Sequence, residues 1–208
     1  MLTVSLTGGI ASGKSVVADV LRRRGCHIDK SDDVARELMA PGRPAWQAIV
    51  ERFGASILAP GRTIDRKKLG AIVFSDAAAR SFLDGLVHPL VMGKKRETIA
   101  RLEAEGRVTI FVSEAALTIE AGFADFFDKV VVAYCPEEVQ VERLMDRDGI
   151  GREDALRRIQ AQMPADEKLE YADYVVDTSG ALEDTVAQAE ELYEQLRLDA
   201  RIKSAASG

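Results

Sequence analysis

The sequence LTVSLTGGIASGKS, residues 2–15, joins a short apolar segment to a glycine-rich loop. Leu2–Thr7 is rich in apolar and β-branched residues, which predicts a buried strand. Gly8–Ser15 matches the pattern G-x-x-x-x-G-K-[ST] at every fixed position, and apolar residues at helical spacing follow over Lys14–Arg24. Glycines let a backbone wrap closely around a phosphate, and the N-terminus of a helix offers amide donors to the anion. The stretch therefore predicts a phosphate-binding loop between a strand and a helix.

The rest of the chain alternates between strand-like and helical segments. Further short apolar runs predict buried parallel strands at residues 26–28, 108–113, 130–135 and 174–177. Helical patterns separate them, and the last, Leu182–Leu196, places its apolar side chains on one stripe. This alternation predicts an α/β fold with a mainly parallel sheet, here the three-layer fold of P-loop nucleotide-binding proteins.

Two segments interrupt this alternation. Residues 31–101 have a helical pattern punctuated by prolines, which predicts a helical insertion, and residues 140–168 are helical and rich in arginine. The small polar residues of 202–208 predict a disordered tail. We therefore expect a nucleotide-binding core with a helical domain and a lid inserted into it: core 1–30, 102–139 and 169–201; helical domain 31–101; lid 140–168.

The loop also predicts which nucleotide the protein binds. Lys14 provides a positive charge for the β- and γ-phosphates, and the Ser15 hydroxyl is a ligand for Mg²⁺. The chain contains no Asn, which excludes the Asn-Lys-x-Asp element with which GTPases read guanine. The alternative is a glycine-rich turn that binds no ligand. We expect ATP with Mg²⁺, held by Gly9, Ile10, Ala11, Ser12, Gly13, Lys14, Ser15 and Val16.

Composition and charge exclude several classes of protein. The net charge of −6 is unfavourable for a general nucleic-acid binder, which presents a basic surface. No apolar run reaches the length of a membrane span, and the N-terminal residues lack the basic start of a signal peptide. Cys26 and Cys135 are far apart in the sequence and predict two reduced thiols. We expect a cytoplasmic protein with no nucleic-acid or membrane partner, and the oligomeric state stays open.

A small P-loop protein with a helical insertion and an arginine-rich segment is typical of a small-molecule kinase, in which a lid excludes water from the reacting phosphate. Within that class the sequence resembles the dephospho-CoA kinase family. The matching residues follow the family's order and spacing along nearly the whole chain: Leu6–Ile10, Gly13–Ser15, Asp32, Val34–Leu38, Pro41–Gly42, Phe53–Gly54, Ile64–Arg66, Leu69, Val73–Asp76, His88–Pro89, Leu117, Glu120–Gly122, Gln140, Arg143–Leu144, Arg147–Asp148, Arg158–Ile159, Gln162, Lys168, Ala172–Asp173 and Ser179–Gly180.

The resemblance implies that ATP and dephospho-CoA are the substrates. The γ-phosphate would go to the ribose 3′-hydroxyl of dephospho-CoA, the last step of coenzyme A synthesis, and residues 31–101 would bind dephospho-CoA. Two alternatives remain: another nucleotide or small-metabolite kinase, and a non-catalytic regulator that binds ATP.

The resemblance assigns the catalytic carboxylate to Asp32, which would orient the acceptor hydroxyl and accept its proton. Asp29 and Asp33 compete for this role, and the alternative for Asp32 is the N-cap of a helix that starts near Val34. The family usually has a further acid two residues before this one, where the chain has Lys30.

Arg143 and Arg147 are four residues apart and so share one face of a helix. The resemblance places them at the ATP phosphates, where forked cationic donors suit the charge of the transferring phosphoryl group. The alternative is pairing with surface carboxylates: Glu142, Asp146 or Asp148. We expect Lys14 and Asp32 to act with these two arginines, and the other arginines of the lid to be solvated: Arg152, Arg157 and Arg158.

Three further positions bear on the site. Glu114 ends a predicted strand, where P-loop proteins often keep an acid near Mg²⁺, and a solvated strand end is the equal alternative. Glu120 keeps a carboxylate of the family. Thr178 stands where the family usually has an Asn near the adenine, so we expect adenine contacts to rest more on backbone groups.

The helical insertion also contains two basic clusters, 66–68 and 94–96. They are either ligands of the dephospho-CoA pyrophosphate or solvated surface.

Overall fold

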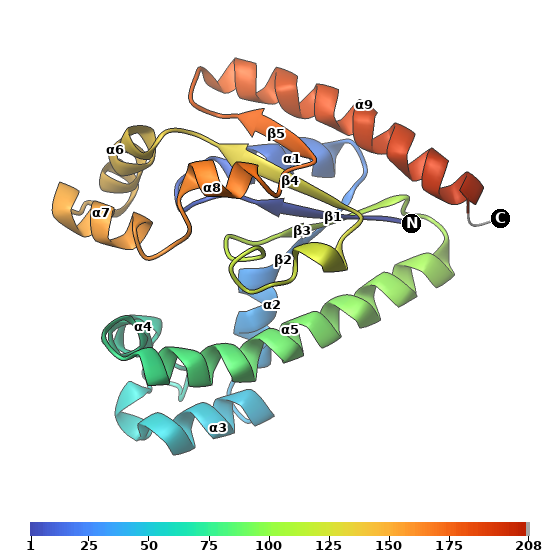
Figure 1. Cartoon of the computed structure of the whole chain (residues 1–208). Helices are drawn as coiled ribbons and strands as arrows, with labels where there is room; N and C mark the ends of the chain where they lie inside the picture. Colours follow the sequence, from blue (N-terminus) through green and yellow to red (C-terminus); the bar gives the residue numbers. More distant parts are fainter. Residues whose placement is uncertain (207–208) are drawn as a thin grey trace. The chain divides into compact units, whose positions relative to one another are not determined.

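The computed structural model describes residues 1–206 and divides them into two compact units. One unit comprises Met1–Lys30 and the chain from Leu102 onward, and the other comprises Ser31–Arg101. The first holds the sheet and the phosphate-binding loop, and the second is helical (Figure 1). Among the helices of residues 1–206, none has an apolar stretch of the length that a membrane requires.

The sheet of the first unit has five parallel strands: β1 (Leu2–Thr7), β2 (His27–Lys30), β3 (Ile110–Glu114), β4 (Lys129–Tyr134) and β5 (Tyr174–Asp177). Their order is β2-β3-β1-β4-β5, so β1 is central and the loop that follows it lies at the carboxyl edge of the sheet. Strands of parallel sheets are apolar because both faces are normally covered. The predicted α/β fold with a parallel sheet is confirmed.

Helices α1 (Lys14–Arg23) and α9 (Leu182–Ala206) pack together against one face of the sheet (Figure 1). Their apolar stripes meet every second residue of the strands, because side chains alternate between the two faces of a strand. Val4 and Leu6 of β1 and Leu192 of α9 belong to this core. The core therefore fixes the end of β1 and the start of α1, and with them the loop between.

The segment after β4 contains three helices: α6 (Glu137–Asp148), α7 (Arg152–Ile159) and α8 (Ala165–Leu169). A small buried core joins α6 to α7, and the loop residues Ile10 and Ala11 pack against it. A 3-10 turn, η2 (Ala124–Phe126), precedes β4. The arginine-rich segment is thus in direct contact with the phosphate-binding loop.

The C-terminal helix is longer than the sequence indicates. The disordered tail expected at 202–208 is wrong for 202–206, which continue α9, and residues 207–208 lie outside the described residues. Lys203 Nζ lies 2.8 and 2.6 Å from the two carboxylate oxygens of Asp128, and alanine occupies positions 205 and 206. Alanine favours helix, and the ion pair anchors the last turns. A distant partner therefore orders a segment whose composition indicates a tail.

The second unit contains α2 (Ser31–Leu38), α3 (Pro44–Phe53), the 3-10 turn η1 (Ala55–Ile57), α4 (Arg66–Ser75) and most of α5 (Ala77–Glu105). Ile49, Ile57 and Leu69 form its buried core. Pro89 lies inside α5 and does not end it, although proline lacks an N–H donor and its ring crowds the preceding turn.

Candidate active site

The phosphate-binding loop has a backbone that few residue types can adopt. Gly8 has a φ of 143°, and a Cβ there would lie 2.4 Å from the carbonyl oxygen of Ala133 in β4. Gly13, the N-cap of α1, has a φ of 79°. Ala11 has a φ of 59°, a left-handed conformation that residues with a side chain rarely adopt. Space and backbone conformation together therefore require glycine at the two fixed glycine positions of the motif.

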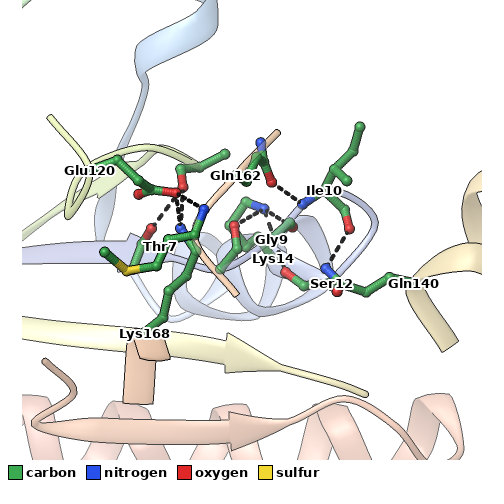
Figure 2. Close-up of polar contacts among 12 residues, drawn as sticks. Thr7, Gly9, Ile10, Ser12, Lys14, Glu120, Gln140, Gln162 and Lys168 are labelled. Carbon is green, nitrogen blue, oxygen red and sulfur yellow. Dashed lines mark hydrogen bonds and ion pairs between the residues drawn. The ribbon is translucent and has the colours of Figure 1, made fainter. Parts of the chain in front are cut away.

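Lys14 folds back over this loop. Its Nζ donates to the carbonyl oxygens of Gly8 (2.9 Å) and Gly9 (2.7 Å) and lies 3.5 Å from Ser12 Oγ (Figure 2). A bound phosphate would exchange these neutral acceptors for charged oxygens, which form stronger hydrogen bonds with an ammonium group. Ser15, the other polar residue of the motif, is exposed in the first turn of α1.

Arg143 is directed toward the loop rather than to a carboxylate of its own helix. Its Nη2 donates to the carbonyl oxygen of Thr178 (2.5 Å), and its Nη1 lies 3.5 Å from Thr178 Oγ1. The Thr178 hydroxyl lies 2.8 Å from the carbonyl oxygen of Ser12 and 3.0 Å from that of Tyr134. Thr178 is buried and packs against Gly13. Thr178 thus supports the backbone of the loop and connects Arg143 to it.

Arg147 faces solvent. Its side chain is 57% exposed and pairs with the neighbouring Asp148 at 2.8 Å. Their hydrogen bond raises the pKa of Arg147 and lowers the pKa of Asp148.

The other arginines of this segment also pair with carboxylates at the surface. Arg158 pairs with Asp148 at 2.8 Å, Arg152 pairs with Glu138, and Arg157 pairs with Asp154. The two arginines that share a helix face in the sequence therefore differ, since Arg143 reaches the loop side and Arg147 does not.

Glu114 ends β3 at the carboxyl edge of the sheet. The strand register pairs it with Leu6 of β1, which leads into the loop, and with Lys30 of β2. Its Oε2 is buried, has no hydrogen-bond partner in the described part of the chain and lies 3.8 Å from Lys30 Nζ. A buried carboxylate oxygen without a donor is an unsatisfied acceptor, which a cation can satisfy. Lys30 is the positive charge beside it.

The three competing aspartates have different environments. Asp32 is exposed in the first turn of α2, in the helical unit. Because α2 begins at Ser31, the alternative that Asp32 is the N-cap of a later helix is wrong. Asp33 pairs with Arg36 at 2.8 Å, and Asp29 is buried in β2. Within residues 1–206 Asp32 has no ion pair, so its carboxylate is available to a ligand.

Three polar residues near the loop received no role from the sequence: Gln140, Gln162 and Lys168. The two glutamines bond to the backbone of Ile10, and the fully buried Lys168 donates to Glu120 Oε1 at 2.5 Å (Figure 2). No local pattern identifies them, because Gln and Lys in amphipathic helices ordinarily face solvent. Only their contacts with distant segments distinguish them.

Comparison with known proteins places this site in a family. The family model described as dephospho-CoA kinase matches residues 2–184. The chain belongs to the dephospho-CoA kinase family. A dephospho-CoA kinase from Geobacter metallireducens is 46% identical over 195 residues, which cover 94% of this chain and 96% of the relative. A dephospho-CoA kinase from Anaeromyxobacter dehalogenans is 45% identical over 197 residues, 95% of this chain and 93% of the relative.

One solved structure carries the same name as these relatives. A dephospho-CoA kinase from Campylobacter jejuni matches with a TM-score of 0.68 and 28% identity, over 93% of this chain and 96% of that chain. A crystal structure of a Thermus thermophilus protein matches with a TM-score of 0.78 and 31% identity, over 94% and 97%. A shikimate kinase from Acinetobacter baumannii, at a TM-score of 0.50 and 18% identity over 96% and 94%, shares the fold alone.

Proposed function

We propose that this protein transfers the γ-phosphate of ATP to the ribose 3′-hydroxyl of dephospho-CoA, which yields ADP and coenzyme A. The observation that carries the proposal is a phosphate-binding loop crossed by Lys14, in a chain of the dephospho-CoA kinase family. The 3′-oxygen forms a bond to the γ-phosphorus while the bond from that phosphorus to the leaving oxygen of ADP breaks. The proton of the hydroxyl passes to a carboxylate.

The loop and the cationic side chains supply the electrostatic stabilisation. Backbone N–H groups within Gly9–Val16, other than that of Ile10, which donates to Gln162, bind the ATP phosphates at the N-terminus of α1. Lys14 offsets the charge of the β- and γ-phosphates. Arg143 acts from the loop side of α6. Arg147, which pairs with Asp148 at the surface, would have to leave that pair to add a second cation. Charge that is spread over the phosphoryl oxygens is well matched by guanidinium groups.

Asp32 orients the 3′-hydroxyl and accepts its proton. Phosphoryl transfer through a loose transition state needs a positioned carboxylate more than a strong base. The exposed position of Asp32 in the first turn of α2 suits contact with a bound acceptor. In this proposal the helical domain 31–101 binds dephospho-CoA, and residues 140–168 form the lid that excludes water from the phosphoryl group.

The residues near the loop fit Mg²⁺. No group of three or more His, Cys, Asp or Glu that could hold a metal occurs among residues 1–206. Mg²⁺ in such sites is usually held by one or two protein oxygens together with substrate phosphates, so a dense acidic cluster is not required. Ser15 would ligate the ion, and Glu114, whose Oε2 is buried without a donor in the described part of the chain, would face its water shell. The ion would offset the charge of the phosphates.

We also infer a cytoplasmic protein without nucleic-acid or membrane partners. Cys26 and Cys135 are both buried and free. Burial raises the pKa of Cys26 to about 12 and also raises that of Cys135, so both stay protonated at neutral pH. Two unlinked, unreactive thiols and a net charge of −6 support this placement.

The first test is an acceptor panel in a coupled assay of ADP release. We expect turnover with dephospho-CoA and little with nucleoside monophosphates or small hydroxy acids. Turnover of a nucleoside monophosphate without turnover of dephospho-CoA would indicate another kinase. Tight ATP binding with no acceptor-dependent ADP release would indicate a regulator.

The second test addresses Asp32. Asp32→Asn removes the proton acceptor without changing size, so kcat should fall about 100-fold or more while the Kd for ATP stays unchanged. Asp33→Asn, one residue away, is the matched control and should keep most activity. Transfer at the wild-type rate by Asp32→Asn would assign the proton acceptor to another residue.

A further inference from the structure

Ile10, in the middle of the phosphate-binding loop, is held on both sides by side chains that are distant in sequence. Its N–H donates to Gln162 Oε1 at 2.8 Å, and its carbonyl oxygen accepts from Gln140 Nε2 at 2.8 Å (Figure 2). Gln140 lies in α6 and is 2% exposed, and Gln162 follows α7. A carboxamide carries both a donor group and an acceptor, so the two side chains satisfy the N–H and the C=O of one loop residue.

Gly9 provides the space for Gln140. Position 9 is one of the variable positions of the loop motif, and Gly9 lacks the positive φ of Gly8 and Gly13. A Cβ at this position would lie 2.2 Å from Gln140 Nε2. The contact with Gln140, rather than the motif or the backbone conformation, therefore accounts for glycine here.

An ion pair between the fully buried Lys168 and the partly exposed Glu120 anchors the segment that carries Gln162. The N–H of Met163 donates to Glu120 Oε1 at 3.1 Å, and Lys168 Nζ donates to the same oxygen at 2.5 Å. Lys168 is fully buried and also donates to the carbonyl oxygen of Ala116 at 3.0 Å. Separating such a pair would leave a buried charge without a partner, which is strongly unfavourable. The segment after α7 is therefore held firmly beside the loop (Figure 2).

The loop conformation needs external support. Ala11, the residue after Ile10, has a φ of 59°, and this left-handed conformation is unfavourable for a residue with a Cβ. Loop amides bind a phosphate best when they are already oriented, because no free energy is then lost in ordering them. Contacts that fix the peptide groups on either side of Ile10 therefore favour phosphate binding.

We propose that Gln140 and Gln162 are positioning residues that hold the Gly9–Ala11 segment in its phosphate-binding conformation and connect the lid segment to it. They act through the backbone of Ile10, not by contact with a substrate. The proposal rests on the proposed function only for the identity of the nucleotide, and it is tested by binding of ATP without any acceptor.

The first experiment removes each hydrogen bond with little change in side-chain volume. Gln140→Leu and Gln162→Leu should each raise the Kd for ATP, measured by calorimetric titration without acceptor, about threefold to tenfold. The KM for ATP should rise equally, and the KM for dephospho-CoA should not change. A wild-type protein that binds ATP but fails the acceptor panel would refute the proposed function and leave this test intact.

Gln188→Leu is the matched control. Gln188 also bonds to the N–H and the carbonyl oxygen of a single residue, Asp177 at the end of β5, at 3.0 and 2.9 Å. Its loss should lower the melting temperature and leave the Kd for ATP unchanged. If the Kd rises in all three variants in proportion to their loss of stability, the glutamines have a structural role only and the proposal is overturned.

The same substitution at the two positions gives a sharper test at pH 9, because burial at position 140 raises the pKa of an introduced glutamate. Gln162→Glu keeps an acceptor for the Ile10 N–H, whereas Gln140→Glu places a carboxylate against the Ile10 carbonyl and provides no donor. Each adds one negative charge, so the difference between them reports the hydrogen bond. Gln140→Glu should weaken ATP binding about tenfold more than Gln162→Glu. Equal affinities would contradict the proposal.

Gly9→Ala tests the contact from the loop side. Its methyl group should displace the Gln140 carboxamide and raise the Kd for ATP as Gln140→Ala does. The double variant Gly9→Ala/Gln140→Ala should then bind no more weakly than either single variant, because both changes break one contact. Additive losses, or single variants that bind ATP as the wild type does, would overturn the proposal.

Discussion

Glycines of the phosphate-binding loop and glycines of the helical unit have opposite surroundings. A Cβ at Gly8 or Gly9 would lie 2.4 or 2.2 Å from another atom, whereas a Cβ at Gly61 or Gly85 would meet nothing within 4 Å. Gly61 has a φ of 85°, and Gly85, inside α5, does not have a positive φ. Close approach of distant segments therefore requires glycine at the two loop positions, whereas a positive φ alone favours it at Gly61 and nothing around Gly85 requires it.

Aspartates of the two units differ in the same way. Asp128 accepts hydrogen bonds from the N–H and hydroxyl of Thr3 (both 2.7 Å) and from Lys203 (2.6 Å), which are distant in sequence. Asp65 caps α4 by accepting from the N–H groups two and three residues further on, at 3.0 and 3.2 Å. A local cap such as that of Asp65 can be inferred from a sequence pattern. Long-range contacts such as those of Asp128 depend on the fold.

The largest expected effect is at Gly8. Gly8→Ala places a methyl group against the carbonyl oxygen of Ala133 and forces a φ of 143° on a residue with a side chain. We expect the free energy of unfolding to fall by roughly 2–6 kcal/mol and ATP binding to be lost. Gly61→Ala meets only the backbone cost of roughly 1–2 kcal/mol and should keep ATP affinity. Chemical denaturation measures the free energy of unfolding of both variants, and titration measures their ATP affinity. Equal losses in the two variants would contradict the difference between loop glycines and glycines of the helical unit.

The next effect is at Lys168. Lys168→Met removes a buried ammonium group that donates to Glu120 and to the carbonyl oxygen of Ala116, and should lower the free energy of unfolding by roughly 2 kcal/mol. The counterpart in the helical unit is Lys68, whose exposed pair with Asp65 at 4.0 Å should contribute less than about 1 kcal/mol when tested by Lys68→Met. Denaturation curves provide both values. The double variant Glu120→Gln/Lys168→Met should recover part of the loss, and a fully additive loss would show that the pair is not coupled.

A smaller effect is expected at Asp128, and it depends on pH. Partial burial alone would raise the pKa of Asp128, but hydrogen bonds from Lys203 and Thr3 outweigh it and hold the pKa below the ordinary value of 3.8. A carboxyl group whose pKa is lowered by folding stabilises the fold above its unfolded pKa, and that contribution is lost as the pH falls through the folded pKa. Asp128→Asn should therefore lower the free energy of unfolding by about 1 kcal/mol at pH 7.

Thermal unfolding between pH 7 and pH 3 checks this prediction. The difference between Asp128→Asn and the wild type should shrink below the ordinary aspartate pKa of 3.8, since the wild-type carboxyl becomes neutral as well. Asp65→Asn is the matched variant in the helical unit, and it should change stability little at pH 7 because Asn caps helices about as well as Asp. If the difference in stability between Asp128→Asn and the wild type stays constant from pH 7 to pH 3, the stabilisation by Asp128 does not depend on its charge and the prediction is refuted.

The smallest effect is expected at Gly85, and it is stabilising. Gly85→Ala adds a methyl group in open space inside α5, where alanine has a higher helix propensity, so the free energy of unfolding should rise by about 0.5–1 kcal/mol. Gly9→Ala is the counterpart, because neither glycine has a positive φ but Gly9 lies in the loop against Gln140 instead of in a helix with open space around it. Denaturation curves should show opposite signs. A loss of stability in Gly85→Ala would mean that its surroundings are as restrictive as those of the loop.

Sequence reasoning located the strands within two residues at each end. It succeeded because parallel strands are apolar runs and the loop motif occupies one short stretch. It was wrong at the C-terminal end of α9, where Lys203 pairs with Asp128, 75 residues away. It also gave no role to Gln140 or Gln162, whose partner Ile10 is 130 or 152 residues away. Patterns within a few residues cannot contain such contacts.

By itself, the sequence determined the phosphate-binding loop and the parallel α/β fold, because both depend on residue types at short, regular spacing. It also determined the family, because the matching residues follow one order along nearly the whole chain. Only the tertiary structure decided which side chains support the loop. It directs Arg143 to the loop side through Thr178, leaves Arg147 at the surface and brings two glutamines to Ile10. The physical reason is that a polar side chain acquires its role from the donors and acceptors that folding places around it, and these come from segments far apart in the chain.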